Sequence, residues 1–202
     1  VNFGQIDLNQ AANATGRIML AAAPAGEMTL DTGAMAGSRA TLHRGELVLT
    51  DQGSSLRAAT VVLERDTVVR GNGTISTIPD GGGSLGMIHA RGVVAPGNSI
   101  GTLDFVGNYT PTGPYQVEYR PPPLGTARGR NMAEGSTLAD QDADLIRVTG
   151  TATLTGATIV PIRLGTAADM NAARTAAGGT LRWLVLRAQG GLGGTQFVAL
   201  SN

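Results

Sequence analysis

Short apolar runs separated by turn-forming residues recur along the first 90 residues of this chain. Each run is closed by Gly, Asn or Asp, and many alternate apolar with polar residues, as residues 41–50 do. This spacing is too short for the crossover helices of βαβ units and has the two-residue period of a strand, so it excludes helices of normal length from most of the chain. We therefore expect an all-β fold. The runs are 18–20, 28–30, 40–42, 47–49, 58–63, 67–69, 74–78 and 85–90.

The segment 92–106 joins two strands through a turn that its residue types force. Residues 93–94 and 100–106 are apolar and β-branched enough to form strands. Between them a Pro-Gly-Asn sequence predicts a turn in which Gly97 or Asn98 adopts a positive φ. The chain is therefore expected to change direction here without a helix.

Composition bounds the class of protein. The 202 residues suffice for one domain with a substantial core, and 30 of them are Gly, without the every-third spacing of collagen. Lys and Arg total 15 and balance 15 Asp and Glu, so no nucleic-acid partner is expected.

Cys is absent, which removes disulfides and thiolate chemistry. No apolar stretch approaches the roughly 20 residues of a membrane helix, so we expect no membrane insertion. The chain begins with Val1 and not Met, and we interpret it as a fragment.

Four sequence blocks follow one another in the second half of the chain. They are residues 95–103 (APGNSIGTL), 107–110 (GNYT), 115–118 (YQVE) and 143–157 (ADLIRVTGTATLTGA). In this order they resemble the C-terminal passenger region of Gram-negative type V autotransporters, and the resemblance covers roughly residues 71–202. Residues 1–70 share only the short apolar runs and the glycines. The chain departs from the family pattern at 119–142, where a proline-rich polar insert replaces a brief turn.

The resemblance implies a right-handed parallel β-helix, a solenoid whose coils of roughly 20 to 25 residues stack along one axis. We expect one continuous domain, with coils over residues 1–100 and further coils with an autochaperone-like C-terminal cap over residues 101–202. The insert at 119–142 is expected to be an exposed loop, because Pro cannot donate to a strand ladder. The family further implies a translocation barrel in the outer membrane, downstream of the chain, as its partner.

Aromatic residues are concentrated after residue 100. Large rings would crowd a thin solenoid, so we expect them in a better-packed terminal segment, where Trp183 and Phe197 either cover the open end or are ordinary core residues. A short helix is predicted at 166–177, because Thr166 and Asp169 have capping-box spacing and two glycines follow. The strands predicted to build the cap are 144–148, 152–154, 158–164, 181–188 and 196–200. The candidates for the folding nucleus are Tyr109, Tyr115, Trp183 and Phe197.

Two motifs that could carry chemistry lack their partners. Ser99 fits the G-x-S-x-G pattern of a hydrolase nucleophile, but His43 and His89 both precede it and no helix is expected after it. The glycines of residues 81–86 fit a dinucleotide-binding pattern, yet a strand is expected to follow them and not a helix. The two histidines lie far apart in the sequence, which argues against a shared metal ion. We expect tight turns at both motifs.

Three carboxylates at Asp140, Asp142 and Asp144 alternate as calcium ligands can. The Gly and Glu that complete an EF-hand loop are missing, which favours a solvated acidic turn before a strand. The resemblance implies a structural role for Asp144, because this position usually opens the strand in the family. The acidic residues elsewhere are scattered and form no pair of the kind that glycosidases use. We therefore expect no catalytic residue, no metal and no cofactor, and interpret the chain as a protein that is not an enzyme.

The leading hypothesis is a structural stem that supports surface display and nucleates β-helix folding during secretion, within a larger adhesin or virulence factor. The expected mechanism is templated folding. The exposed strand edge of the coils that have already folded offers its backbone N–H and C=O groups to the next segment of the chain. The alternative is that the segment is itself an adhesin that binds a host-cell or matrix ligand, or neighbouring cells by self-association. A β-helical carbohydrate-active enzyme is a third possibility. All three place the chain at the cell surface or in the secreted fraction.

Overall fold

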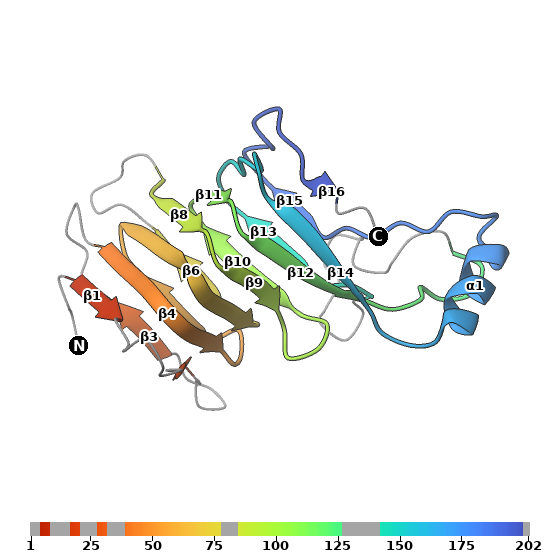
Figure 1. Ribbon diagram of the computed structural model, residues 1–202, viewed down its shortest axis with the longest axis horizontal. Coiled ribbons are helices and arrows are strands. Elements are labelled where there is room, and N and C mark those ends of the chain that lie inside the picture. The colour runs from red at the N-terminus through yellow and green to blue at the C-terminus, as the bar shows by residue number, and fades with distance from the viewer. Residues whose placement is uncertain are drawn as a thin grey trace.

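The computed structural model describes residues 5–8, 17–20, 28–31, 39–77, 85–126 and 142–199, and these form an all-β fold with one short helix (Figure 1). The all-β expectation is confirmed. The N-terminal strands are β1 (Gln5–Leu8), β2 (Arg17–Leu20), β3 (Met28–Asp31), β4 (Arg39–Leu49), β5 (Ser54–Arg57), β6 (Thr60–Gly71), β7 (Thr74–Ser76) and β8 (Met87–Ala90). The others are β9 (Val93–Pro96), β10 (Thr102–Val106), β11 (Asn108–Pro111), β12 (Pro114–Tyr119), β13 (Leu145–Val148), β14 (Thr158–Arg163), β15 (Leu186–Ala188) and β16 (Val198–Ala199).

The strands build two sheets in which all pairs of named strands are parallel. The ten-stranded sheet has the order β1-β4-β6-β9-β12-β14-β16, with β2, β8 and β11 paired beside this path. The six-stranded sheet has the order β15-β13-β10-β7-β5-β3. From β4 to β16 the chain visits the two sheets in turn, so strands that pair are separated in sequence by an excursion through the other sheet. The stack is long in one direction, as Figure 1 shows.

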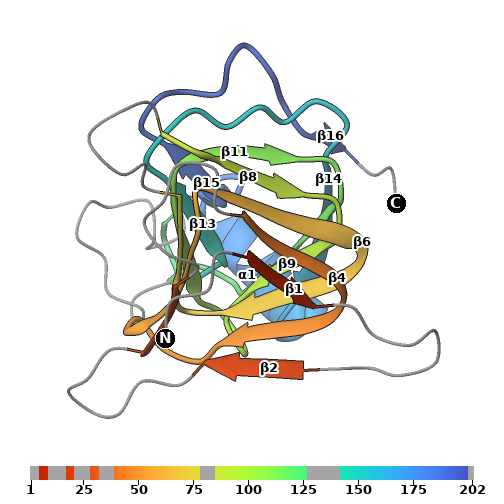
Figure 2. The same ribbon diagram turned by 90° about the vertical axis from the view of Figure 1, so that its left-hand side faces the viewer.

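A bend within single strands curls the larger sheet. The register of β4 and β6 shifts between Leu42 and Arg44, and Gly45 has a φ of 104° just beyond that shift. An extra residue in one strand increases the local twist and bends the strand, so each strand covers two faces of the core (Figure 2). The separate strands predicted at 40–42 and 47–49 are therefore parts of one strand, β4.

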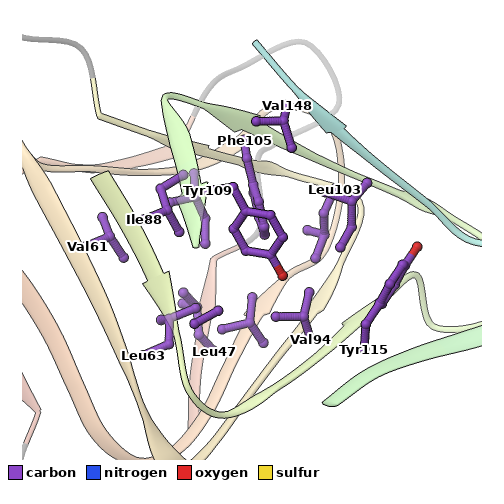
Figure 3. Packing of buried hydrophobic residues seen from close by; sticks show 14 of the residues in the cluster. Leu47, Val61, Leu63, Ile88, Val94, Leu103, Phe105, Tyr109, Tyr115 and Val148 are labelled. Atoms are coloured by element: carbon purple, nitrogen blue, oxygen red, sulfur yellow. The ribbon is translucent and has the colours of Figure 1, made fainter. Parts of the chain in front are cut away.

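The core consists of inward side chains arranged in columns across successive strands. One column contains Leu47, Val69, Val94 and Tyr115, which are register partners in sequence order and are all buried. A column on the six-stranded sheet contains Leu56, Ile75, Phe105 and Val148. The side chains of the columns converge on one interior (Figure 3), where burial of each Val, Leu or Phe contributes roughly 1.5 to 3 kcal/mol.

The C-terminal part is less regular than the sequence predicts. The strands predicted at 144–148 and 158–164 are present as β13 and β14. The strands predicted at 181–188 and 196–200 correspond to β15 and β16, which are much shorter than predicted. The strand predicted at 152–154 is a single bridge between Tyr109 and Ala152. Gly191, Gly193 and Gly194 all have positive φ, which interrupts an extended strand between β15 and β16.

The predicted helix is confirmed as α1 (Ala167–Ala176), which lies beyond the ends of β12 and β14 (Figure 1). Its capping box is complete. The Asp169 amide donates to the Thr166 hydroxyl, and the Asp169 carboxylate accepts from the Thr166 amide, both at 3.1 Å. Gly178 and Gly179 have positive φ and end the helix. The loop predicted at 119–142 begins one residue late, because Tyr119 pairs with Arg163 in the sheet, and its residues 127–141 lie outside the described ranges.

Candidate functional site

The turn that joins β9 to β10 has the predicted conformation. Gly97 has a φ of 81°, and its amide donates to the carbonyl oxygen of Gly71 at 2.6 Å. The Asn72 side-chain oxygen accepts from the Thr102 amide at 3.0 Å. A Cβ on Gly101 would lie 2.0 Å from that Asn72 oxygen, so a larger residue would push the two turns apart. The turn is thus bound to the preceding turn, which joins β6 to β7.

Asp144 binds the same turn to β12. It precedes β13, and one carboxylate oxygen accepts from the Gly101 amide at 2.9 Å while the other accepts from the Glu118 amide at 2.8 Å. The side chain thus binds two backbone segments that are 43 and 26 residues away from it along the chain. Asp144 is only 1% exposed, so these bonds form away from bulk water.

Burial of Asp144 and Asp142 corrects the prediction of a solvated acidic turn. Burial raises the pKa of Asp144 to about 8. The hydrogen bonds from the Glu118 and Gly101 amides lower this pKa, and the charge of Glu118 raises it, but burial has the largest effect. Asp142 is also 1% exposed, and its carboxylate accepts from the Arg120 guanidinium at 3.1 Å. Asp140 lies outside the described residues, and no group of three metal-ligating side chains occurs within the described part. The two aspartates therefore tie backbone segments together.

The four candidates for the folding nucleus all belong to one hydrophobic cluster or pack against it. Tyr109 and Tyr115 are buried within the cluster, and Trp183 and Phe197 pack against it from partly exposed positions. The rings of Tyr115 and Phe197 have centroids 5.9 Å apart. Tyr109 instead packs edge-on against Phe105 at 4.7 Å. Large rings are therefore accommodated in the interior of the C-terminal half, ahead of the strands that were predicted to build the cap. The bridge partner of Tyr109 is Ala152, whose small side chain leaves room for a ring in the interior.

Trp183 and Tyr115 attach the segment that leads into β15. The Trp183 indole donates to the Arg120 carbonyl oxygen at 3.1 Å, and its ring packs edge-on against Tyr119 with centroids 5.0 Å apart. The Tyr115 hydroxyl donates to the Val185 carbonyl oxygen at 2.6 Å. These contacts join residues 63 and 70 positions apart in sequence. Tyr115, Tyr119, Asp144 and Trp183 are called the C-terminal clasp below.

An open apolar groove of about 420 Å³ lies next to the clasp. Val117, Tyr119 and Ile159 contribute to it from β12 and β14, and Trp183 borders it from the segment after α1. Trp183 and Phe197 are half-buried and pack against the hydrophobic core. Sequence reasoning selected Trp183 but missed Tyr119 and Asp144 as its structural companions.

The motifs that suggested chemistry lie apart from one another. Ser99 is exposed in the turn before β10, and His89 is half-buried in β8. Burial and the charges of Arg91 and Arg39 lower the pKa of His89. Residues 81–84 of the glycine motif lie outside the described ranges, while Gly86 directly precedes β8 and not a helix. Of the described residues of these motifs, none lines the groove, whereas Gly101, the last residue of the G-x-S-x-G pattern, donates its amide to Asp144 of the clasp.

Comparison with other proteins adds no relative. The chain matches no protein-family model, no curated protein and no solved structure. Within the described residues, no helix combines the length and apolar character needed to cross a membrane.

Proposed function

We propose that this chain is part of a right-handed parallel β-helix and serves as the structural stem of an autotransporter passenger. The observation that carries the proposal is the parallel register that continues from β4 to β14, with each strand paired to one from the next coil and inward residues in columns. Such a stack gains stability from contacts between neighbouring coils, as solenoids do. The ordered sequence blocks that resemble autotransporter passengers support the same assignment.

The proposed role of the C-terminal half is to nucleate folding. In this proposal the passenger leaves a downstream translocation barrel with its C-terminal end first, and the terminal coils fold at the surface of a Gram-negative cell. Parallel pairing between distant segments is slow, because loop closure must precede the contacts that stabilise it. The clasp supports this role, since its side chains fix segments that are 26 to 70 residues apart within the terminal coils. Display of a larger adhesin would follow from templated growth of the stack.

Replacing Trp183 by Ala is expected to slow refolding severalfold, because it removes the edge-on contact with Tyr119 and the hydrogen bond to Arg120. The measurement is stopped-flow refolding and unfolding over a range of denaturant concentrations, followed by far-UV circular dichroism, because the variant lacks the only Trp.

The matched control is Val69→Ala, which truncates a fully buried side chain in β6. This change is expected mainly to accelerate unfolding, because β6 is added to a preformed terminal seed. Refolding slowed equally by both substitutions, at equal loss of stability, is incompatible with a C-terminal nucleus.

A further inference from the structure

The groove beside the clasp is an opening lined by apolar side chains of the larger sheet. Its lining includes Val117, which belongs to the hydrophobic core, and Ile159, which is the register partner of Tyr115 and packs against that core. Tyr119 and Trp183 form an aromatic border, and Met170 of α1 borders it from the helix. A volume of about 420 Å³ falls within the range of roughly 300 to 1,000 Å³ that small-molecule sites occupy.

Two arginines give this apolar groove a positive charge. Arg174 of α1 and Arg182 both line it, and none of its lining residues within the described ranges is Asp or Glu. Among the residues that the structure describes, neither arginine has an ion pair or a hydrogen-bonded side-chain partner. Both are exposed, so each guanidinium can turn towards a bound anion without losing a contact within the described chain. The groove is thus complementary to a molecule with an apolar body and an anionic end.

We propose that the groove binds a free medium-chain fatty acid, with the alkyl chain along the apolar floor and the carboxylate on Arg174 and Arg182. One alkyl chain suits an apolar groove of about 420 Å³. A planar guanidinium matches a carboxylate through two parallel hydrogen bonds. A peptide would place backbone amides against a lining that offers few partners for them, which costs free energy. This ligand site is independent of the stem function proposed above, since neither the register nor the clasp requires it to be filled.

The test uses the fluorescence of Trp183, the only Trp in the chain, during titration of the intact protein with decanoate below its micelle concentration. We expect a saturable change, because the indole borders the groove. Octanoate should bind about tenfold more weakly, since each methylene removed from water contributes substantially to affinity. Decan-1-ol has the same chain without the charge and should bind more weakly than decanoate.

The variant Arg174→Gln/Arg182→Gln should bind decanoate roughly fivefold more weakly, with a smaller dependence on salt, as expected for two exposed ion pairs. Its control is Arg163→Gln, which removes an exposed arginine of β14 that does not line the groove and should leave the affinity unchanged. Circular dichroism of each variant verifies that the fold is retained.

Two results would overturn the proposal. One is the absence of a saturable fluorescence change with decanoate at any concentration below micelle formation. The other is equal affinity for decanoate and decan-1-ol together with no effect of the double substitution, which would reduce the groove to an unselective apolar surface. Neither result bears on the stem function, which is tested by folding kinetics.

Discussion

The free energy of unfolding should fall by an amount on the order of 5 kcal/mol as the pH rises from 4 to 8, because Asp144 binds its proton more tightly in the folded state. Burial raises the pKa of Asp144 from 3.8 to about 8. A raised folded-state pKa gives stability that is fully present below the unfolded-state pKa and is lost as the pH rises through the folded-state value. The loss should therefore occur between about pH 4 and pH 8 and stop above it.

Denaturant unfolding at pH 4, 6 and 8 measures this dependence, and Asp144→Asn identifies its source. The amide does not titrate, so the variant should lose most of the pH dependence whatever its absolute stability. Glu118 and Arg70 line the same small pocket as Asp144. Tyr115 is also near, since burial and then the charge of Asp144 raise the pKa of its hydroxyl. The control Glu118→Gln should keep most of the decrease in the free energy of unfolding with pH. If this decrease were identical in the wild type and in Asp144→Asn, burial would not raise the pKa of Asp144.

Removing the hydroxyl from two buried tyrosines should have opposite effects, about 2 kcal/mol apart. Tyr109 has no hydrogen-bond partner for its hydroxyl among the described residues, so Tyr109→Phe relieves a buried polar group and should stabilise the protein by about 1 kcal/mol. The Tyr115 hydroxyl donates to Val185 at 2.6 Å, so Tyr115→Phe should destabilise by about 1 kcal/mol. The Val185 carbonyl keeps its bond from Ile146, which limits this cost.

The two tyrosine variants act as controls for each other, because both are buried and lose the same atom. Chemical denaturation at one pH gives the change in the free energy of unfolding for each variant. If this free energy depends on denaturant concentration with a similar slope in both variants, their unfolded states are comparable. Destabilisation by both substitutions, to the same extent, would mean that the Tyr109 hydroxyl has a partner in solution.

Local features of the fold were predictable because neighbouring residues determine them. Thr166 and Asp169 define the start of α1 through their spacing alone, and Gly97 allows the turn after β9 through its missing side chain. The two-residue alternation likewise identifies strands. The alternation does not show that β4 continues through a bend, because the bulge after Leu42 depends on the pairing of β4 with β6.

The role of Asp144 was not predictable, because it depends on backbone amides 43 and 26 residues away. An acidic residue before a strand is ordinarily solvated, and only the neighbouring coils make this one buried. The burial of Tyr109 has the same origin, since the small partner Ala152 is brought alongside it by the stack. A carboxylate directly preceding an apolar run, in a chain with few acidic residues, was the one available signal.

The order in which the coils form tests the central claim most directly. Pulsed hydrogen exchange during refolding, read out by mass spectrometry of peptides, follows the protection of each strand separately. The account predicts that the amides of β12, β13 and β14 become protected before those of β4 and β6. Protection of β4 and β6 first, or of all five strands at the same time, would contradict a C-terminal nucleus and with it the proposed stem function.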